Sequence, residues 1–591
     1  MWLVGLAPAV FLPGALNRFV FLKLAVVAAA WACALMGARP VRLQRRVLVV
    51  LGLGAAVLAV SAALGSAPLA QLIGRAPRYE GAVSLSVYVG ALLMGAWLLG
   101  SGADPRLRRQ LLRATAVAAS LMAIVALADL LGVHLLETSV ARPGSLLGNA
   151  TEQGAYGAGV FGLGVVLYAA GERSRENLLT LGAGAALVVL SASRGALLGL
   201  VVALAVALVL GSSRSRRAAV VAGAVASVAA LSLPLTRQRL LMQSPLSQQT
   251  ISGRAQEWAE SLALVRERLL IGWGPSGFVD AWPSVQSADY VRLAGLARLD
   301  SPHSLVLQAA LSGGLLLSVL AVALVVLVVR SVRRLRREPG EATWALASLA
   351  AVAGWSTVLL THFTAPGSTP FFCVLAGALL SERRPLPVPS AQPAPPARLM
   401  RWAGPALAGG LALVLLLAAA AEVPLRKGLG ELQAGDGQGA EASFTVAHAL
   451  RPWDADLDAQ IAHALVAQPS QLPSTRVDAY LQRASSHLPG DPSVLTDRAL
   501  RAQQLGELSQ ARADLDAAHR LSPNDPVVLL ARGRVRARAG DLQGAVGDLE
   551  ASARLMPRNP VPLQTLAGLY AQSGQSDLAA QTLARAQTLG G

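Results

Sequence analysis

Four polar motifs interrupt an otherwise apolar chain, and they hold the residues that could carry chemistry. They are SASRG at 191–195, SGRAQEWAESLAL at 252–264, IGWGPSGF at 271–278 and SPHSLVLQAALSGG at 301–314. Histidine titrates near neutral pH, and arginine offers forked donors that match phosphate. His303 is the only histidine in or beside the stretch 235–300, and Arg194 and Arg254 lie in the first two motifs. These three residues are the catalytic candidates, for a reaction that binds an anion or moves a proton.

Two further polar segments lie upstream, GRAPRYEG at 74–81 and RPGSLLGNATEQGAYG at 142–157. They add candidate substrate-binding residues to those of the later motifs, and the full set is Arg78, Arg142, Trp258, Gly272 and Gly274. Each candidate also has a plain structural alternative. An arginine can be part of a surface ion pair or can reach the membrane interface, a loop tryptophan can anchor at the bilayer surface, and a histidine at a helix start can serve as a cap.

The elements that must position these residues are membrane helices. The chain has 591 residues, 54% of them apolar, and a mean hydropathy of +0.50, which indicates a membrane protein. Apolar stretches of about 20 residues predict transmembrane helices, because lipid offers no partner to unpaired backbone groups. They fall near 2–13, 19–38, 47–66, 83–101, 111–132, 153–170, 177–192, 195–211, 218–234, 303–329, 343–360, 369–381 and 403–421. The first is short and lacks the charged start of a cleaved signal peptide.

Arginine placement predicts the orientation of these helices, because positively charged loops stay in the cytoplasm. Every second loop is rich in arginine: Arg39, Arg42, Arg45 and Arg46; Arg106, Arg108, Arg109 and Arg113; Arg173 and Arg175; Arg214, Arg216 and Arg217; and Arg330, Arg333, Arg334, Arg336 and Arg337. The loops 67–82, 133–152 and 235–300 therefore face outward. An odd number of spans places the C-terminal domain outside as well.

The net charge of +17 and the two cysteines exclude several function classes. The positive charge sits in short clusters between apolar stretches, which indicates membrane topology, and no nucleic-acid partner is expected. Cys33 and Cys373 both lie in apolar stretches, so neither a disulfide framework nor a cysteine metal site is predicted.

A period of 34 residues repeats after Glu422. It is carried by Pro489, Pro523 and Pro557; Pro492, Pro526 and Pro560; Gly506, Gly540 and Gly574; and Ala511, Ala545 and Ala579. A glycine followed five residues later by alanine fits a turn and a close-packed helix pair, and proline marks the start of each repeat. The pattern resembles the tetratricopeptide repeat (TPR), with a degenerate earlier copy near Gly435 and Ala440. Such an array indicates a scaffold that binds a protein partner.

The polar motifs, taken in order, resemble the O-antigen ligase and polymerase superfamily of membrane glycosyltransferases. The resemblance covers about residues 70–380 and rests on the serine-arginine-glycine at a helix junction, the arginine and tryptophan of the loop, the glycine-rich turn and the histidine that opens the next helix. The family usually has asparagine after that histidine, and this chain has Ser304.

The resemblance implies transfer of a glycan from undecaprenyl diphosphate to an acceptor such as lipid A core, without a metal, a cofactor or a nucleotide sugar. Arg194 and Arg254 would then bind the diphosphate, Arg142 would add a second contact, and His303 would activate the acceptor hydroxyl. Direct attack on the anomeric carbon would invert its configuration. The implied location is the bacterial inner membrane, with membrane lipid around the helices.

The expected fold is all-α, with a polytopic transmembrane bundle of about 12–13 spans and a periplasmic TPR α-solenoid. The membrane domain is expected at 1–384, with its large periplasmic loop at 235–300. A proline-rich cytoplasmic linker is expected at 385–402, the last span at 403–421 and the TPR domain at 429–591.

Several functions stay open at this level. A ligase would transfer a finished glycan, a polymerase would use another lipid-linked repeat unit as acceptor, and a protein glycosyltransferase would use a polypeptide. A membrane anchor that only displays the TPR domain is the non-enzymatic alternative. A single helix would be enough for that role, which favours an enzyme for a chain with about a dozen spans and polar residues beside the bilayer.

Overall fold

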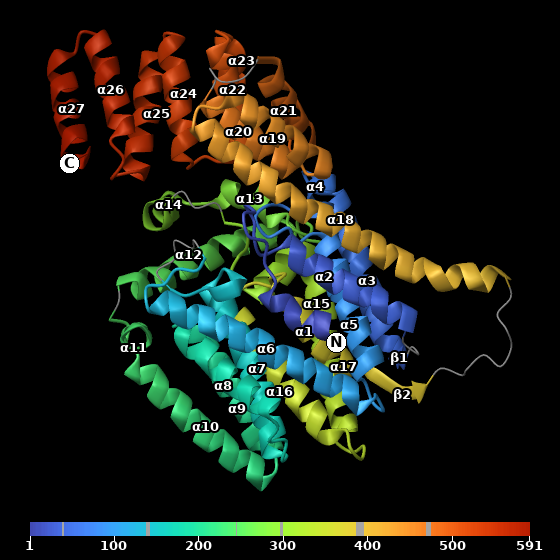
Figure 1. Ribbon diagram of the computed structural model, residues 1–591. Helices are drawn as coiled ribbons and strands as arrows, with labels where there is room; N and C mark the ends of the chain where they lie inside the picture. The colour runs from blue at the N-terminus through green and yellow to red at the C-terminus, as the bar shows by residue number, and fades with distance from the viewer. Residues whose placement is uncertain are drawn as a thin grey trace.

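The computed structural model describes residues 1–37, 41–136, 142–243, 245–295, 299–385, 395–468 and 474–590. Figure 1 shows a helical bundle with a curved helical array above it. The fold is all-α, as expected, apart from one short antiparallel strand pair that joins β1 (Val41–Leu43) to β2 (Ser381–Pro385). The two halves of the sequence thus form a membrane bundle and a helical solenoid in contact with each other.

The bundle is built from helices that follow the apolar stretches of the sequence. They are α1 (Trp2–Leu6), α2 (Phe21–Gly37), α3 (Arg45–Ala63), α4 (Pro68–Ile73), α5 (Ala82–Leu99), α6 (Pro105–Leu130), α7 (Ala150–Ala169), α8 (Arg175–Leu190), α9 (Arg194–Leu210), α10 (Ser213–Ser232), α15 (Leu305–Leu335), α16 (Ala342–Leu359) and α17 (Thr369–Leu379). Short 3₁₀ turns cover Ala7–Ala9 and Ser145–Leu147. Between α10 and α15 lie α11 (Pro234–Leu240), α12 (Pro245–Glu267), α13 (Phe278–Val285) and α14 (Ala288–Ala294).

Six of the described helices are long and apolar enough to cross a membrane by themselves. They are α3, α5, α6, α15, α16 and the part of α18 from Trp402, and the bent pair of α10 and α11, with an angle of 98°, brings the number to seven. Other stretches that hydropathy predicts as spans form shorter apolar helices, namely α2, α9 and α17. The segment 2–13 is not a span, because α1 has five residues and ends in a 3₁₀ turn.

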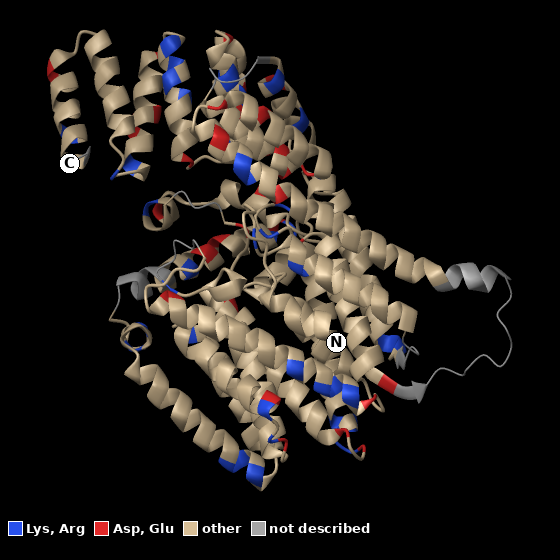
Figure 2. Cartoon of the chain, in the orientation of Figure 1, with Lys and Arg blue, Asp and Glu red and all other residues tan. Residues whose placement is uncertain are grey.

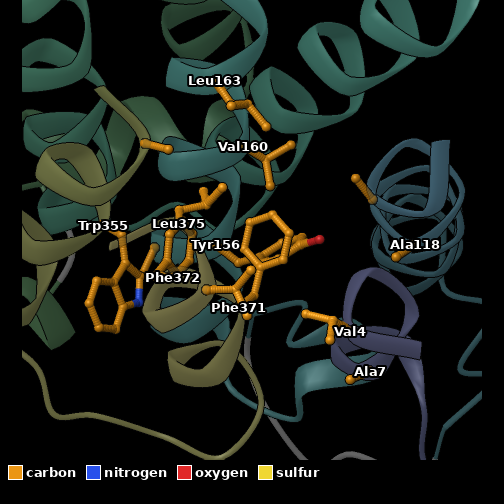
Figure 3. Packing of buried hydrophobic residues seen from close by; sticks show 14 of the residues in the cluster. Val4, Ala7, Ala118, Tyr156, Val160, Leu163, Trp355, Phe371, Phe372 and Leu375 are labelled. Atoms are coloured by element: carbon orange, nitrogen blue, oxygen red, sulfur yellow. The ribbon is translucent and has the colours of Figure 1, made fainter. Parts of the chain in front are cut away.

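The bundle core lies around α7, whose side chains are nearly all buried. Its glycines let neighbours approach closely: a Cβ atom on Gly157 would lie 2.9 Å from the Gly184 carbonyl oxygen of α8. Figure 3 shows the aromatic part of this core, where Trp355 stacks on Phe372 with ring centroids 4.9 Å apart and Tyr156 meets Phe371 edge-on. Close packing of this kind gives the bundle a rigid centre on which polar residues can be positioned.

The arginine-rich ends of the helices gather on one side of the bundle, as the alternating loops predict. Arg108 at the start of α6 pairs with Glu341 at the start of α16, with nitrogen and oxygen 2.6 Å apart. Arg336 donates to the Leu210 carbonyl oxygen at the end of α9. Figure 2 shows this blue cluster at the lower end of the bundle. We call the opposite side, with the described parts of 64–81, 131–149, 191–193, 233–304 and 360–368, the loop face.

The C-terminal half folds as a series of helical hairpins with the predicted spacing. Its helices are α18 (Pro395–Gln433), α19 (Gly437–Leu450), α20 (Ala455–Ala467), α21 (Ser474–His487), α22 (Pro492–Gln504), α23 (Leu508–Leu521), α24 (Pro526–Arg538), α25 (Leu542–Leu555), α26 (Val561–Gln572) and α27 (Ser576–Gly590). Gly506, Gly540 and Gly574 turn each hairpin with positive φ angles of 82°, 84° and 76°. Gly435 does the same between α18 and α19, so the degenerate first copy is real.

The boundary between the bundle and the array differs from the expected linker and last span. Residues 386–394 of the proline-rich stretch lie outside the described residues, but α18 already begins at Pro395. The helix then runs without a break through 403–421 to Gln433. Its Leu425 lies in the same hydrophobic core as Phe444 of α19, which is the first core of the TPR array. The last membrane helix and the first TPR helix are therefore one element.

The TPR array sits on the loop face of the bundle (Figure 1). The backbone N–H of Asn17 donates to the Glu422 carboxylate at 2.9 Å, so the N-terminal segment also lies on this face. Figure 1 marks the N-terminus among the bundle helices and the C-terminus at the far end of the array. The contact of Asn17 with Glu422 shows that α2 begins on the face where the membrane part of α18 ends, and the TPR domain lies on this arginine-poor side.

Candidate functional site

The site is built on the loop face around α12 and the start of α15. Ser304 caps α15 by accepting from the Leu307 backbone N–H, so the serine that replaces the usual asparagine is a competent cap. The indole N–H of Trp258 donates to the Pro302 carbonyl oxygen at 3.0 Å. His303 has a φ of 43°, a backbone conformation that non-glycine residues rarely adopt and that surrounding contacts must hold. Trp258 thus supports the turn that presents the histidine.

His303 forms a pair with a buried carboxylate. Its Nδ1 lies 2.9 Å from Oε1 of Glu257, which is on α12 and buried, while the histidine side chain keeps 24% of its surface exposed. A carboxylate at Nδ1 holds the ring with a lone pair on Nε2 and stabilises the imidazolium that forms when Nε2 accepts a proton. This geometry suits a general base.

Four arginines gather beside this pair, and they come from separate elements. Arg142 precedes the 3₁₀ turn at Ser145–Leu147, Arg194 begins α9, Arg239 is on α11 and Arg254 is on α12. Burial, together with the positive charges of Arg239, Arg254 and Arg194, lowers the pKa of Arg142 to about 10. Burial also lowers the pKa of Arg254, against the favourable charge of Glu257. We call these four residues the arginine cluster.

Three residues of the arginine cluster contact neutral acceptor atoms. Arg254 donates to the Thr361 carbonyl oxygen at 2.6 Å, Arg142 donates to the Ser191 carbonyl oxygen at 3.4 Å, and Arg194 contacts the Met242 sulfur. The buried Nε of Arg239 has no partner among the described residues. Forked, partly dehydrated arginines of this kind form a site for an anion with several oxygens.

Arg78 lies near His303, and two carboxylates and an aromatic ring hold its guanidinium. Its guanidinium pairs with Glu80 at 2.7 Å and with Asp300 at 3.2 Å, and it stacks over the Phe363 ring at 4.4 Å. The Phe363 ring is 5.3 Å from that of His303. Arg78 is therefore not a surface ion pair, although its charge is already neutralised, and it is not part of the arginine cluster.

Gly272 and Gly274 have a backbone role. The turn that holds them pairs with a break in α15, where Trp273 N–H donates to the Leu311 carbonyl oxygen and Gly274 N–H to that of Ser312. A Cβ atom on Gly272 would lie 2.4 Å from the Leu311 oxygen, and Gly272 has a φ of 66°. The turn fixes the end of α12 to α15, and through these helices it positions Glu257 and His303.

Sequence analysis missed two residues of the site, Glu257 and Arg239. Glu257 lies one turn from Arg254 in the same helix, so its place on that helical face was the available signal. Arg237 and Arg239 both lie on α11, and no local signal in the sequence shows which of the two belongs to the site. His362 is buried, and this burial, with the charges of His303 and Arg254, lowers its pKa well below the ordinary value. It stays neutral beside the site.

One family model matches the part of the chain that holds most residues of this site. Residues 179–322 match the family model described as O-Antigen ligase. The predicted family resemblance is confirmed. The matched stretch contains Arg194, Arg239, Arg254, Glu257 and His303, whereas Arg78 and Arg142 lie before it. An O-antigen ligase domain within a multi-pass helical bundle indicates a membrane glycosyltransferase.

Several solved structures have a weak likeness to less than a third of the chain. "Crystal structure of MamA" is 15% identical with a TM-score of 0.24, and covers 27% of this chain and 93% of that chain. MamA from Desulfovibrio magneticus RS-1 is 14% identical with a TM-score of 0.25, and covers 29% and 94%. Pseudomonas aeruginosa pilF is 22% identical with a TM-score of 0.26, and covers 29% and 77%. None of the curated proteins compared with the chain matches it.

Proposed function

We propose that the O-antigen ligase domain transfers a glycan from undecaprenyl diphosphate to an acceptor hydroxyl, with lipid A core as the acceptor. The observation that carries this proposal is the arginine cluster beside the His303–Glu257 pair. A diphosphate is a compact anion with many oxygens, and four gathered guanidinium groups match it in charge and geometry. The histidine beside them supplies a base for the hydroxyl that attacks.

The proposed reaction is a single displacement. The acceptor oxygen attacks the anomeric carbon, its proton passes to Nε2 of His303, and the bond from that carbon to the diphosphate oxygen breaks. Glu257 stabilises the imidazolium, and the arginine cluster stabilises the negative charge that develops on the leaving diphosphate. Attack from the face opposite the leaving group inverts the anomeric carbon. The imidazolium then returns its proton to solvent, and no metal takes part.

The proposed membrane orientation follows from the arginine-rich end of the bundle. Positive loops stay in the cytoplasm, so the loop face, the site and the TPR domain would lie in the periplasm above the inner membrane. A lipid carrier could then reach the arginine cluster from the bilayer while the acceptor approaches from the aqueous side. The ionic groups buried at the site also favour an enzyme over a membrane anchor, because a simple anchor has no use for them.

A transfer assay in nanodiscs tests the proposal. The purified full chain is given a polyprenyl diphosphate glycan and a lipid A core acceptor, with and without EDTA. We expect transfer with inversion in both conditions, and a loss of about 10²–10⁴-fold in rate for His303→Ala. Arg239→Gln should raise the KM for the donor about tenfold, whereas its exposed neighbour on α11, Arg237→Gln, should leave it unchanged.

The surface polysaccharide of cells that lack the gene separates the proposed ligase from its alternatives. A missing ligase leaves bare core, whereas a missing polymerase leaves core capped by single repeat units. Full-length polymer still attached to core would contradict both assignments. In the purified assay, full transfer by correctly inserted His303→Ala would contradict the proposed mechanism.

A further inference from the structure

A cavity of about 410 Å³ lies where the N-terminal segment, the loop around Arg78 and the TPR domain meet. Its polar lining includes Asn17, Arg78, Asn149, Glu152 and Gln460. The four residues of the arginine cluster are not among the described residues that line it. The cavity is therefore separate from the proposed diphosphate site. Its volume falls in the range of small-molecule sites.

Glu152 gives this cavity an unsatisfied acceptor. The residue lies in the first turn of α7 and only 6% of its surface is exposed. Its Oε1 atom has no hydrogen-bond partner among the described residues. A buried carboxylate oxygen without a donor costs free energy, so a ligand that brings O–H or N–H groups to it would be stabilised.

The charges around the cavity favour an uncharged ligand. The lining holds two arginines, Arg18 and Arg78, and two carboxylates, Glu152 and Glu422, and Glu152 also lies near the buried Lys23. Arg78 is already paired with Glu80, and Glu422 with Arg451 at 2.6 Å, so neither needs a counter-ion from the ligand. Aromatic rings also line the cavity, from Phe19, Tyr79 and Phe363. Amides, a carboxylate and aromatic faces together suit a saccharide, which offers many hydroxyls and apolar C–H faces.

The cavity lies close to the proposed base. Phe363 lines the cavity, and its ring centroid is 5.3 Å from that of His303. The guanidinium of Arg78, also in the lining, stacks on the same ring. Phe363 therefore lies both in the cavity wall and beside the ring of His303.

We propose that this cavity binds the saccharide of the acceptor, and that the TPR domain forms part of its wall through Gln460 and Glu422. The proposal rests on the proposed glycan transfer. A saccharide in the cavity, hydrogen-bonded to Glu152, would extend a neighbouring hydroxyl past Phe363 toward Nε2 of His303. The TPR domain would then contribute directly to the choice of acceptor.

Two variants that fill the cavity test this site in the full chain in nanodiscs. Gln460→Trp adds bulk from α20, and Gly367→Ala adds a Cβ atom 2.4 Å from Oε1 of Glu152. Both should raise the KM for the acceptor at least about tenfold while the KM for the donor stays unchanged. Gln564→Trp, an exposed glutamine of α26, is the matched control and should change neither.

A direct binding measurement tests the cavity independently of the transfer reaction. Lipid-free core oligosaccharide is the probe, and its binding to the unmodified chain should weaken at least about tenfold in Gln460→Trp. Failure of the unmodified chain to transfer glycan would count against the proposed function, whereas the binding result would still decide the cavity. An unchanged acceptor KM and unchanged oligosaccharide binding in both filled variants would overturn the site. So would a rise in the KM for the donor alone.

Discussion

The four residues of the arginine cluster concentrate positive charge at one place, which favours the binding of an anion. Arg142 has its pKa lowered to about 10 because it is buried and because Arg239, Arg254 and Arg194 lie near it. Like charges disfavour the charged form, so the arginine cluster stores electrostatic free energy that a bound diphosphate would release. A carrier with a diphosphate should therefore bind more tightly than a carrier with a monophosphate, because it brings more negative charge to the four guanidinium groups.

Glu257 provides the sharpest prediction at this scale. Glu257→Gln keeps a polar side chain beside His303 but removes the charge that stabilises the imidazolium. We expect kcat to fall about 10- to 100-fold, because the imidazolium that forms in the reaction loses its counter-charge. Steady-state transfer kinetics measure this fall.

Glu260→Gln is the matched control for this prediction. Glu260 is on the same helix and bonds to Ser287 and Gln256 rather than to the histidine. Its variant should keep the kcat of the unmodified chain. If Glu257→Gln and Glu260→Gln lowered kcat equally, a structural role for this part of α12 would explain the loss better than a role of Glu257 beside the histidine.

At the scale of elements, the break in α15 connects the glycine-rich turn to the catalytic pair. Gly313 and Gly314 interrupt the helix, with Gly314 at a φ of 64°, and the Leu315 backbone N–H donates to the Leu269 carbonyl oxygen at 2.8 Å. The end of α12 is thereby fixed to the helix that begins after His303. These backbone hydrogen bonds, together with the bond from the Trp258 indole to Pro302, set the spacing between Glu257 and the histidine.

Gly314→Ala should disturb this junction more than an equivalent change elsewhere. A Cβ atom at Gly314 would lie 2.3 Å from the Leu270 carbonyl group, so the two segments would have to separate. We expect a clear fall in melting temperature together with a loss of transfer activity. Gly340→Ala is the control, because Gly340 has a φ of 78° but open space around it. It should show only the conformational cost of about 1–3 kcal/mol and full activity. Equal losses in the two variants would contradict the proposed junction.

Elements with a local signal could be predicted from the sequence, and contacts between distant segments could not. The hairpin turns at Gly506, Gly540 and Gly574 repeat at a fixed period, so each copy supports the others. The arginine-rich loops likewise recur at every second connection between predicted spans, so each one supports the same orientation. In contrast, Glu257 and His303 are 46 residues apart, and their pairing depends on how α12 folds back against α15. Hydropathy also could not show that α18 continues from the membrane into the first repeat.

At the scale of the whole molecule, the TPR domain is docked on the loop face and is not a detached arm. The loop 74–81 lies between the two halves of the protein. Arg78 and Glu80 face the site residues, whereas Arg75 is buried against the array and the large loop. Arg75 contacts Asp280 of α13, Asp456 at 3.0 Å and Asp491 at 2.7 Å. One arginine thus joins the bundle loop, the large loop and two TPR helices.

Arg75→Ala should loosen the TPR domain from the loop face, because it leaves three carboxylates close together without their counter-charge. Breaking a buried ionic contact of this kind costs on the order of 3–5 kcal/mol. We expect faster hydrogen–deuterium exchange in α4, α13 and the N-terminal turn of α22, and a lower transfer rate because the loop that carries Arg78 also moves. Arg476→Ala removes an exposed ion pair within the array, 2.7 Å from Glu441, and should change neither measurement. If exchange in α13 stayed as slow in Arg75→Ala as in the unmodified chain, the docking would depend on the apolar contacts around Ala67, Leu488 and Val494 instead.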